Sequence, residues 1–211
     1  MKTRRNFLAT ALIATGGLYL TGFKAAAQSA ADAALSRYAV LRDKENPVLG
    51  NPSGNLTVAS YFDYQCPYCK KAEKDLRNVA REDGQLRVVL KDWPILGGAS
   101  GYAAKLSLAT RYQGKHAEAH AALMLTSGRL SEASVRDVLA KAGVDVARAT
   151  QDLATNRVAI DAVLARNNAQ AEAFGFQGTP AFIIGTFRVP GVLDAAGFKQ
   201  AIADARKAAA K

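Results

Sequence analysis

The stretch Cys66-Pro67-Tyr68-Cys69 contains the only two cysteines in a chain of 211 residues and places them one helical turn apart. It follows an apolar run, Leu56–Phe62, that is typical of a buried strand, and a helix-forming segment comes after it. Because proline suits the first position of a helix, Pro67 places Cys66 at the helix start. Unpaired N–H groups and the helix dipole favour negative charge there, so we expect Cys66 to be partly ionised and Cys69 to be the resolving thiol.

Two other interpretations of the cysteine pair have to be weighed. A structural disulfide is disfavoured, because a bridge that closes so short a loop constrains little of the unfolded chain. A zinc site would combine Cys66 and Cys69 with His116 and His120, which lie four residues apart on an expected helix. The 46 residues between Cys69 and His116 far exceed the spacing of compact zinc sites. We therefore expect no metal and interpret both histidines as surface or helix-packing residues.

Composition and charge narrow the class of protein. A chain of this length with 49% apolar residues can bury a sizeable core and is most simply one domain. The net charge of +10 would suit nucleic-acid binding, but four of the 28 basic residues lie in the first 27 positions, which contain no acidic residue. The remaining 24 basic and 18 acidic residues, a net charge of +6, are interspersed and form no recognition motif. This pattern argues against nucleic-acid binding.

Residues 1–27 have the pattern of an export signal, with a basic start, an uncharged run from Phe7 to Phe23 and small residues before the expected cleavage site. The segment Thr3–Leu8 resembles a twin-arginine signal, and a general secretory signal is the alternative. An uncleaved anchor is disfavoured, since this run is short for a membrane span of ~20 residues. Export to the periplasm or beyond would suit a reactive cysteine pair, because disulfide chemistry persists in oxidising compartments.

The segment 28–46 is expected to be an N-terminal helix and linker. Its residues Leu35, Tyr38, Ala39 and Leu41 would share one side of a short helix. The pattern leaves open whether that side packs on the domain or mediates association between chains.

Residues 47–97 are expected to form a β-α-β unit. Their Pro- and Gly-rich start permits at most a short edge strand before the central strand at Leu56–Phe62. The helix that begins at Cys66 should stop before Gly84. The apolar segment Leu86–Leu90 would then form a strand parallel to the central one.

Residues 98–174 contain no good strand and are expected to form a helical insertion. Gly114 and Gly143 mark expected helix ends. Asp145 has the position of an N-cap for a long helical segment that is broken near Asn156.

Residues 175–211 are expected to complete the fold as a β-β-α unit. Ala181–Ile184 is a short apolar strand, and the two residues Gly185-Thr186 suit a tight hairpin to a second strand. Asp194 then has the position of an N-cap for the last helix.

The order β-α-β, helical block and β-β-α, with Cys-x-x-Cys after the first central strand and Thr-Pro before the third, resembles a thioredoxin fold of the DsbA type. The resemblance covers about residues 48–208 and is carried by the motifs Tyr61–Cys69, Trp93–Gly97 and Gly178–Phe182. It implies an α/β thioredoxin fold that is interrupted by an all-helical insertion. It also implies an exported thiol–disulfide oxidoreductase without a cofactor, whose partners are cysteine-containing exported proteins and a protein that reoxidises or reduces the dithiol.

The resemblance assigns the catalytic role to Cys66 and Cys69. It assigns redox tuning to Pro67 and Tyr68, and substrate binding to Thr179 and Pro180. In this family the proline corresponding to Pro180 has a cis peptide bond and lies beside the dithiol. Many members carry an acidic residue six positions before the first cysteine, where this chain has Ser60. The Pro-Tyr dipeptide lacks the histidine of strongly oxidising members and favours a potential between ~−270 mV, as in thioredoxin, and ~−120 mV, as in DsbA.

Several roles are open to more than one interpretation. Asp63 is either a proton relay to the buried thiol or, more commonly for such a position, a solvated carboxylate at a strand end. Trp93 is expected to pack in the core rather than to bind substrate. The alternatives to a disulfide oxidase are an isomerase or reductase of the same fold and a non-catalytic peptide-binding or chaperone module. The short segment before Pro47 favours a monomer.

Overall fold

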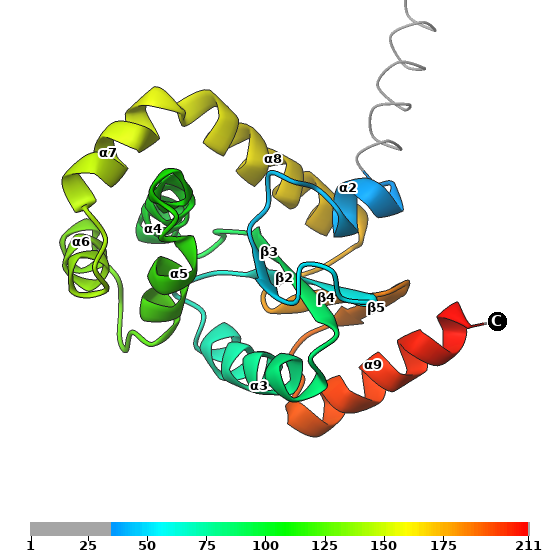
Figure 1. Cartoon of the computed structure of the whole chain (residues 1–211). Coiled ribbons are helices and arrows are strands. Elements are labelled where there is room, and N and C mark those ends of the chain that lie inside the picture. The colour runs from blue at the N-terminus through cyan, green and yellow to red at the C-terminus, as the bar shows by residue number, and fades with distance from the viewer. Residues whose placement is uncertain (1–34, 211) are drawn as a thin grey trace, which may run out of the picture.

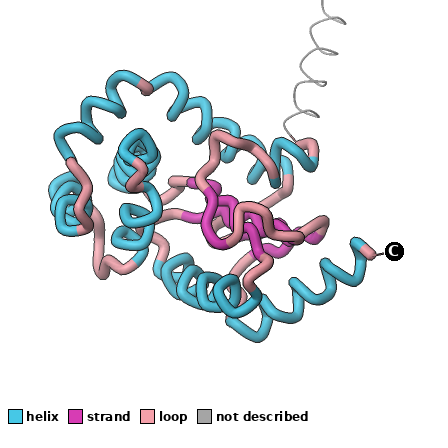
Figure 2. The backbone as a smooth tube through the Cα atoms, viewed as in Figure 1, coloured by secondary structure: helices cyan, strands magenta, loops and turns pink. Residues whose placement is uncertain are grey.

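The computed structural model describes residues 35–210, which form a five-stranded mixed sheet with helices on both faces and a block of helices at one end (Figure 1). The export signal expected at residues 1–27 lies outside the described residues, as do residues 28–34 of the expected N-terminal helix. Figure 2 shows the strands gathered in the middle, with helices around them.

The regular elements follow the order expected for a β-α-β half, a helical block and a β-β-α half. The strands are β1 (Val48–Gly50), β2 (Leu56–Phe62), β3 (Leu86–Asp92), β4 (Ala181–Ile184) and β5 (Phe187–Pro190). The helices are α2 (Arg37–Leu41), α3 (Pro67–Asp83), α4 (Gly98–Ala109), the 3₁₀ helix η1 (Thr110–Gln113), α5 (His116–Met124), α6 (Glu132–Lys141), α7 (Val146–Thr155), α8 (Arg157–Ala173) and α9 (Ala195–Ala209).

Strand β2 lies at the centre of the sheet, whose order is β1-β3-β2-β4-β5. β2 and β3 are parallel and are joined through α3, as the sequence predicts. β4 is antiparallel to both β2 and β5, and the Gly185-Thr186 hairpin joins β4 to β5. The short β1 is an edge strand, antiparallel to β3. The carboxyl end of β2, where the cysteines follow, therefore lies in the middle of the sheet edge.

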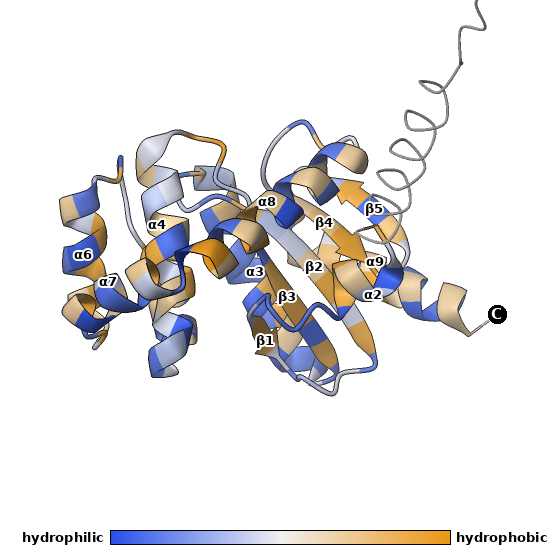
Figure 3. Ribbon diagram, turned by 90° about the horizontal axis from the view of Figure 1, so that it is seen from above, coloured by the Kyte–Doolittle hydropathy of each residue, from blue (hydrophilic) through white to orange (hydrophobic). Residues whose placement is uncertain are grey.

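Both faces of the sheet are covered, and all seven residues of β2 are buried. Because side chains alternate along a strand, Val58 and Phe62 pack in the same cluster as residues of α3 and α9. Ala59 and Tyr61 pack on the other face with residues of α2, of α8 and of the loop after α8. Figure 3 shows hydrophobic residues concentrated on the strands and mixed surfaces on α6 and α7.

The segment between β3 and β4 is helical. Gly114 is the C-cap of η1, and α6 ends two residues before Gly143, close to the helix ends that the sequence predicts. Asp145 is the N-cap of α7 and accepts a hydrogen bond from the backbone N–H of Arg148 at 3.0 Å. The predicted break is confirmed, because Asn156 separates α7 from α8.

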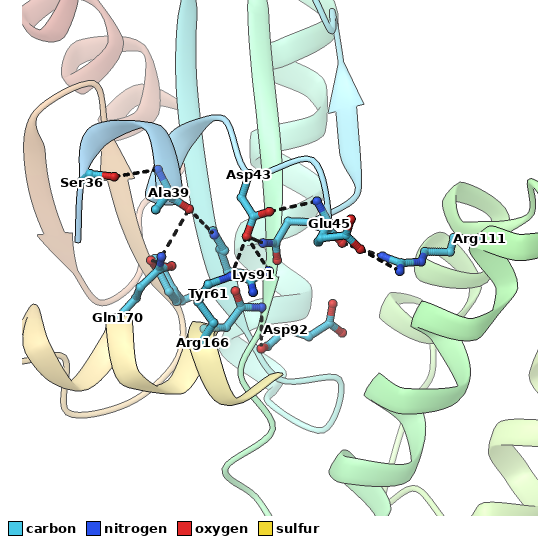
Figure 4. Close-up of polar contacts among 12 residues, drawn as sticks. Ser36, Ala39, Asp43, Glu45, Tyr61, Lys91, Asp92, Arg111, Arg166 and Gln170 are labelled. Atoms are coloured by element: carbon cyan, nitrogen blue, oxygen red, sulfur yellow. Dashed lines mark hydrogen bonds and ion pairs between the residues drawn. The ribbon is translucent and has the colours of Figure 1, made fainter. Parts of the chain in front are cut away.

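The described part of the N-terminal segment is docked on the domain (Figure 4). The carbonyl oxygen of Ala39 accepts hydrogen bonds at 3.3 Å from Lys91 on β3 and from Gln170 on α8. Asp43 pairs with Arg166 at 2.7 Å. These contacts favour packing on the domain over association between chains.

The side of α2 that packs inward differs from the prediction. Leu41 is buried as predicted, but Val40 is buried as well and Tyr38 is 61% exposed. The reason is that α2 has five residues, little more than one turn, so helical periodicity does not fix which side chains face the sheet.

Candidate active site

Cys66 is the N-cap of α3, and Pro67 occupies the first position of the helix, as the sequence predicts. The Cys66 sulfur accepts a hydrogen bond from the backbone N–H of Cys69 at 3.4 Å. Both cysteines are free thiols with little exposure, 4% for Cys66 and 2% for Cys69. Tyr68, between them, is 62% exposed and stands at the surface next to the pair.

The two thiols differ strongly in acidity. The pKa of Cys66 is lowered from 9.0 to about 6, mainly because the Cys69 thiol donates a hydrogen bond to the Cys66 sulfur. Burial opposes this shift, while hydrogen bonds from Thr179 and from the backbone N–H groups of Cys69 and Tyr68 reinforce it. The pKa of Cys69 is raised far above its ordinary value, first by burial and then by its hydrogen bond with Cys66. The helix start therefore contributes to the acidity of Cys66, but the neighbouring thiol contributes more.

The loop before β4 lies against the cysteines. The Thr179–Pro180 peptide bond is cis, and the carbonyl oxygen of Thr179 lies 3.3 Å from the Cys66 sulfur, where it accepts a hydrogen bond from the thiol when Cys66 is protonated. This bond joins residues that are 113 positions apart in the sequence. The structure thus brings Cys66, Thr179 and Pro180 together at one end of the central strands.

Residues 57–203 match the sequence model of the DSBA-like thioredoxin domain. The chain belongs to this family. A thioredoxin-like oxidoreductase from Silicibacter pomeroyi DSS-3 is 37% identical, with a TM-score of 0.78 over 82% of this chain and 98% of that chain. The thiol-disulfide exchange protein α-DsbA2 from Wolbachia pipientis is 26% identical, with a TM-score of 0.75 over 85% of this chain and 97% of that chain.

Curated relatives match at similar identity but are much longer. The Na⁺/H⁺ antiporter NhaA 1 of Salinispora arenicola is 28% identical over 139 residues, which are 65% of this chain and 21% of that protein. The chain thus spans about a fifth to a quarter of the length of the curated relatives it matches. The family match and the solved structures confirm the thioredoxin fold with its helical insertion.

Asp63 of the DsbA-like protein is buried, so the expectation of a solvated carboxylate is wrong. Its carboxylate accepts hydrogen bonds from the backbone N–H groups of Gln65, Ile95 and Leu96 at 2.7, 2.8 and 2.9 Å. The Ser100 hydroxyl donates a further bond at 2.7 Å. Asp63 therefore fixes the loop before Cys66 to the loop that follows β3. The sequence holds no local signal for this role, because the partners lie up to 37 positions away.

Replacing Asp63 with alanine should lower the free energy of unfolding by about 3 kcal/mol, because several buried donors lose a charged acceptor. Urea unfolding measures the change. Asp63→Asn is the matched control, since it keeps one acceptor oxygen and should cost less. A loss below about 1 kcal/mol in Asp63→Ala would show that the contacts do not stabilise this loop.

Trp93 packs in the core, as the sequence predicts. Its side chain is 5% exposed and lies in the cluster on the Tyr61 face of the sheet. The indole N–H donates a hydrogen bond to Asn168 of α8 at 2.9 Å. Trp93 thus joins the loop after β3 to the helical block.

A chain of buried polar groups links α3 to the helical block, and sequence reasoning did not identify it. His120 of α5 contacts the Tyr64 hydroxyl through Nδ1 at 3.0 Å and Glu73 through Nε2 at 3.1 Å. The Tyr64 hydroxyl also bonds to Ser107 at 2.9 Å, and Ser107 lies 3.5 Å from Nε2 of His116. Both histidines are buried, so packing is the correct interpretation and a surface position is wrong.

His116 should make stability depend on pH. Burial and the neighbouring His120 lower its pKa from 6.5 to about 3, so between these values the unfolded chain binds a proton that the folded chain does not. Stability should fall as the pH drops through this window, by up to about 1.4 kcal/mol per pH unit. Urea unfolding should show a weaker dependence in His116→Asn. If the free energy of unfolding changed with pH in the same way in the unaltered protein and in His116→Asn, the role assigned to His116 would be wrong.

The zinc alternative gains no support from the geometry. Within residues 35–210, no group of three or more His, Cys, Asp and Glu side chains could hold a metal ion. Over the same range, every helix is too short or too polar to span a membrane.

Proposed function

We propose that the chain is an exported disulfide oxidase of the DsbA type, in which Cys66 and Cys69 exchange a disulfide with cysteines of other exported proteins. The observation that carries the proposal is the opposite shift in acidity of the two thiols. The pKa of Cys66 is about 6, so it is largely a thiolate at neutral pH, whereas burial keeps Cys69 protonated. A thiol with a low pKa is a good leaving group, and its low pKa stabilises the reduced form of the protein.

The proposed reaction starts with the Cys66–Cys69 disulfide. A substrate thiolate attacks the Cys66 sulfur, a substrate–Cys66 bond forms, and the Cys66–Cys69 bond breaks. Cys69 leaves with the electron pair and takes up a proton. A second substrate thiolate then attacks the substrate sulfur, and the Cys66 thiolate leaves. The substrate loses two electrons to the dithiol, which a redox partner must reoxidise; no metal or organic cofactor is required.

We assign substrate contact to Thr179 and Pro180 and redox tuning to Pro67 and Tyr68. Supporting this, the Thr179 carbonyl oxygen lies 3.3 Å from the Cys66 sulfur, so a bound peptide backbone at this loop would lie beside the reacting sulfur. Pro67 and Tyr68 are exposed next to the cysteines, where an approaching protein would meet them.

We assign residues 1–27 to an export signal of the twin-arginine type, followed by an N-terminal helix and linker at 28–46. In the proposed organisation, a helical insertion at 98–174 divides the thioredoxin core at 47–97 and 175–211. The composition of the first 27 residues supports export to the periplasm. A similar solved structure, 25% identical, is described as a periplasmic thioredoxin-like protein from Salmonella enterica.

Three assays distinguish the proposed oxidase from its alternatives. An oxidase should speed the oxidative refolding of a reduced, cysteine-containing protein. An isomerase should instead rescue a scrambled substrate, and a reductase should mainly speed the reduction of insulin. A protein inactive in all three reactions, with peptide binding retained, would contradict the proposal and favour a binding module.

A further inference from the structure

A groove of about 720 Å³ runs along α3, between this helix, the edge of the sheet at β1 and β3, and the end of α5. Its apolar lining includes Leu49, Leu76, Val88 and Met124. Leu125 lies at its border and is 85% exposed. The volume is within the range of ligand sites, about 300 to 1,000 Å³. We call this region the basic groove, because of the charges on its α3 side.

Four cationic side chains of α3 line the groove at spacings of four, three and four residues: Lys70, Lys74, Arg77 and Arg81. At a helix rise of ~1.5 Å per residue they form a stripe about 16 Å long. Lys70 is held by the Thr126 carbonyl and hydroxyl at 2.7 and 2.8 Å. Lys74 and Arg77 are exposed and form no ion pair or hydrogen bond with other side chains among residues 35–210. Their charges are available to a partner.

The lining offers little negative charge to neutralise the stripe. Among the described residues that line the groove, Glu73 is the only acidic one. Its carboxylate is buried and lies 3.1 Å from the His120 ring. The acids at the end of α3 are engaged elsewhere, Glu82 with Lys199 and Asp83 with Arg206. An unneutralised cationic stripe beside an apolar surface is complementary to a ligand with both acidic and apolar groups.

We propose that the basic groove binds an extended peptide segment in which acidic and apolar residues alternate. Side chains on one side of an extended chain repeat every ~6.6–6.8 Å, close to the ~6 Å rise between Lys70 and Lys74 or between Arg77 and Arg81. Acidic side chains can therefore follow the stripe while the intervening apolar ones face the apolar lining. A single anionic group would reach only part of a stripe of this length.

One end of the stripe lies near the cysteine pair in the sequence. Lys70, which lines the groove, follows Cys69 directly in the first turns of α3. A peptide that runs along the stripe toward Lys70 therefore approaches the end of α3 that carries the cysteine pair. We assign the bound segment to a substrate or redox partner, and this assignment rests on the proposed function. The binding of an acidic and apolar peptide in the groove does not depend on it.

The test measures binding of a cysteine-free peptide to the full chain by fluorescence anisotropy. The probe is a fluorescein-labelled peptide of three Glu-Leu repeats, compared with one of three Lys-Leu repeats. We expect the acidic peptide to bind and the basic one not to bind. The double variant Lys74→Glu/Arg77→Glu should weaken binding of the acidic peptide about tenfold.

The matched control is Lys141→Glu/Lys207→Glu, which makes the same change in net charge on α6 and α9 and should alter the affinity less than twofold. Leu125→Ser should weaken binding several-fold, because it removes apolar contact. If Lys74→Glu/Arg77→Glu does not fold, Lys74→Gln/Arg77→Gln replaces it and should show a smaller loss in the same direction.

Equal losses in the groove and control variants would overturn the proposal, because only net charge would then matter. Unchanged binding in the groove variant would overturn it as well. A protein that binds the peptide but fails in all the exchange assays would disprove the proposed function and leave the groove assignment standing.

Discussion

Replacing Cys66 with serine should reduce disulfide exchange to the uncatalysed rate. A serine hydroxyl cannot form a disulfide, and the remaining Cys69 is 2% exposed with a raised pKa, so it cannot substitute as the attacking thiolate. Oxidative refolding of a reduced substrate protein measures the loss. Thermal unfolding of the variant should show that the fold is retained, since the side chains are similar in size. Activity within tenfold of the unaltered protein would contradict the role assigned to Cys66.

Replacing Cys69 with serine should abolish turnover but allow a mixed disulfide to form with a substrate that already contains a disulfide. The Cys66 thiolate, still at the helix start, attacks the substrate disulfide, one substrate sulfur leaves as a thiolate, and no second enzyme thiol is present to resolve the adduct. We expect nearly one equivalent of disulfide-linked substrate per protein, detected by non-reducing electrophoresis and released by a reductant.

The double variant Cys66→Ser/Cys69→Ser is the control for this trap and should form no adduct. If Cys69→Ser accumulated no more adduct than the double variant, the order of the two cysteines in the mechanism would be wrong.

The centre of the fold could be predicted from the sequence because its signals are local. A nearly continuous apolar run identified β2, and proline after Cys66 identified the start of α3. The hairpin at Gly185-Thr186 could be predicted for the same reason, since a two-residue loop that begins with glycine favours a tight turn.

The contacts that support the site could not be predicted in the same way. Asp63 looked like a solvated carboxylate, because its partners follow β3 and reach it only through the parallel pairing of β2 and β3. His120 lies 47 residues from Glu73 and 56 from Tyr64, so no spacing rule relates them. The acidity of Cys66 was expected from the helix start alone, whereas the larger contribution comes from the neighbouring thiol.

The pH dependence of the redox potential tests the central claim, that Cys66 is a thiolate in the reduced protein at neutral pH. Below the Cys66 pKa of about 6, reduction takes up two protons with two electrons; above it, only Cys69 takes one. Equilibration with a thiol buffer from about pH 4.5 to 8.5 should give a slope of about 59 mV per pH unit at low pH and about 30 mV above pH 6. A slope that stays near 59 mV up to about pH 8.5, where an ordinary thiol ionises, would contradict it.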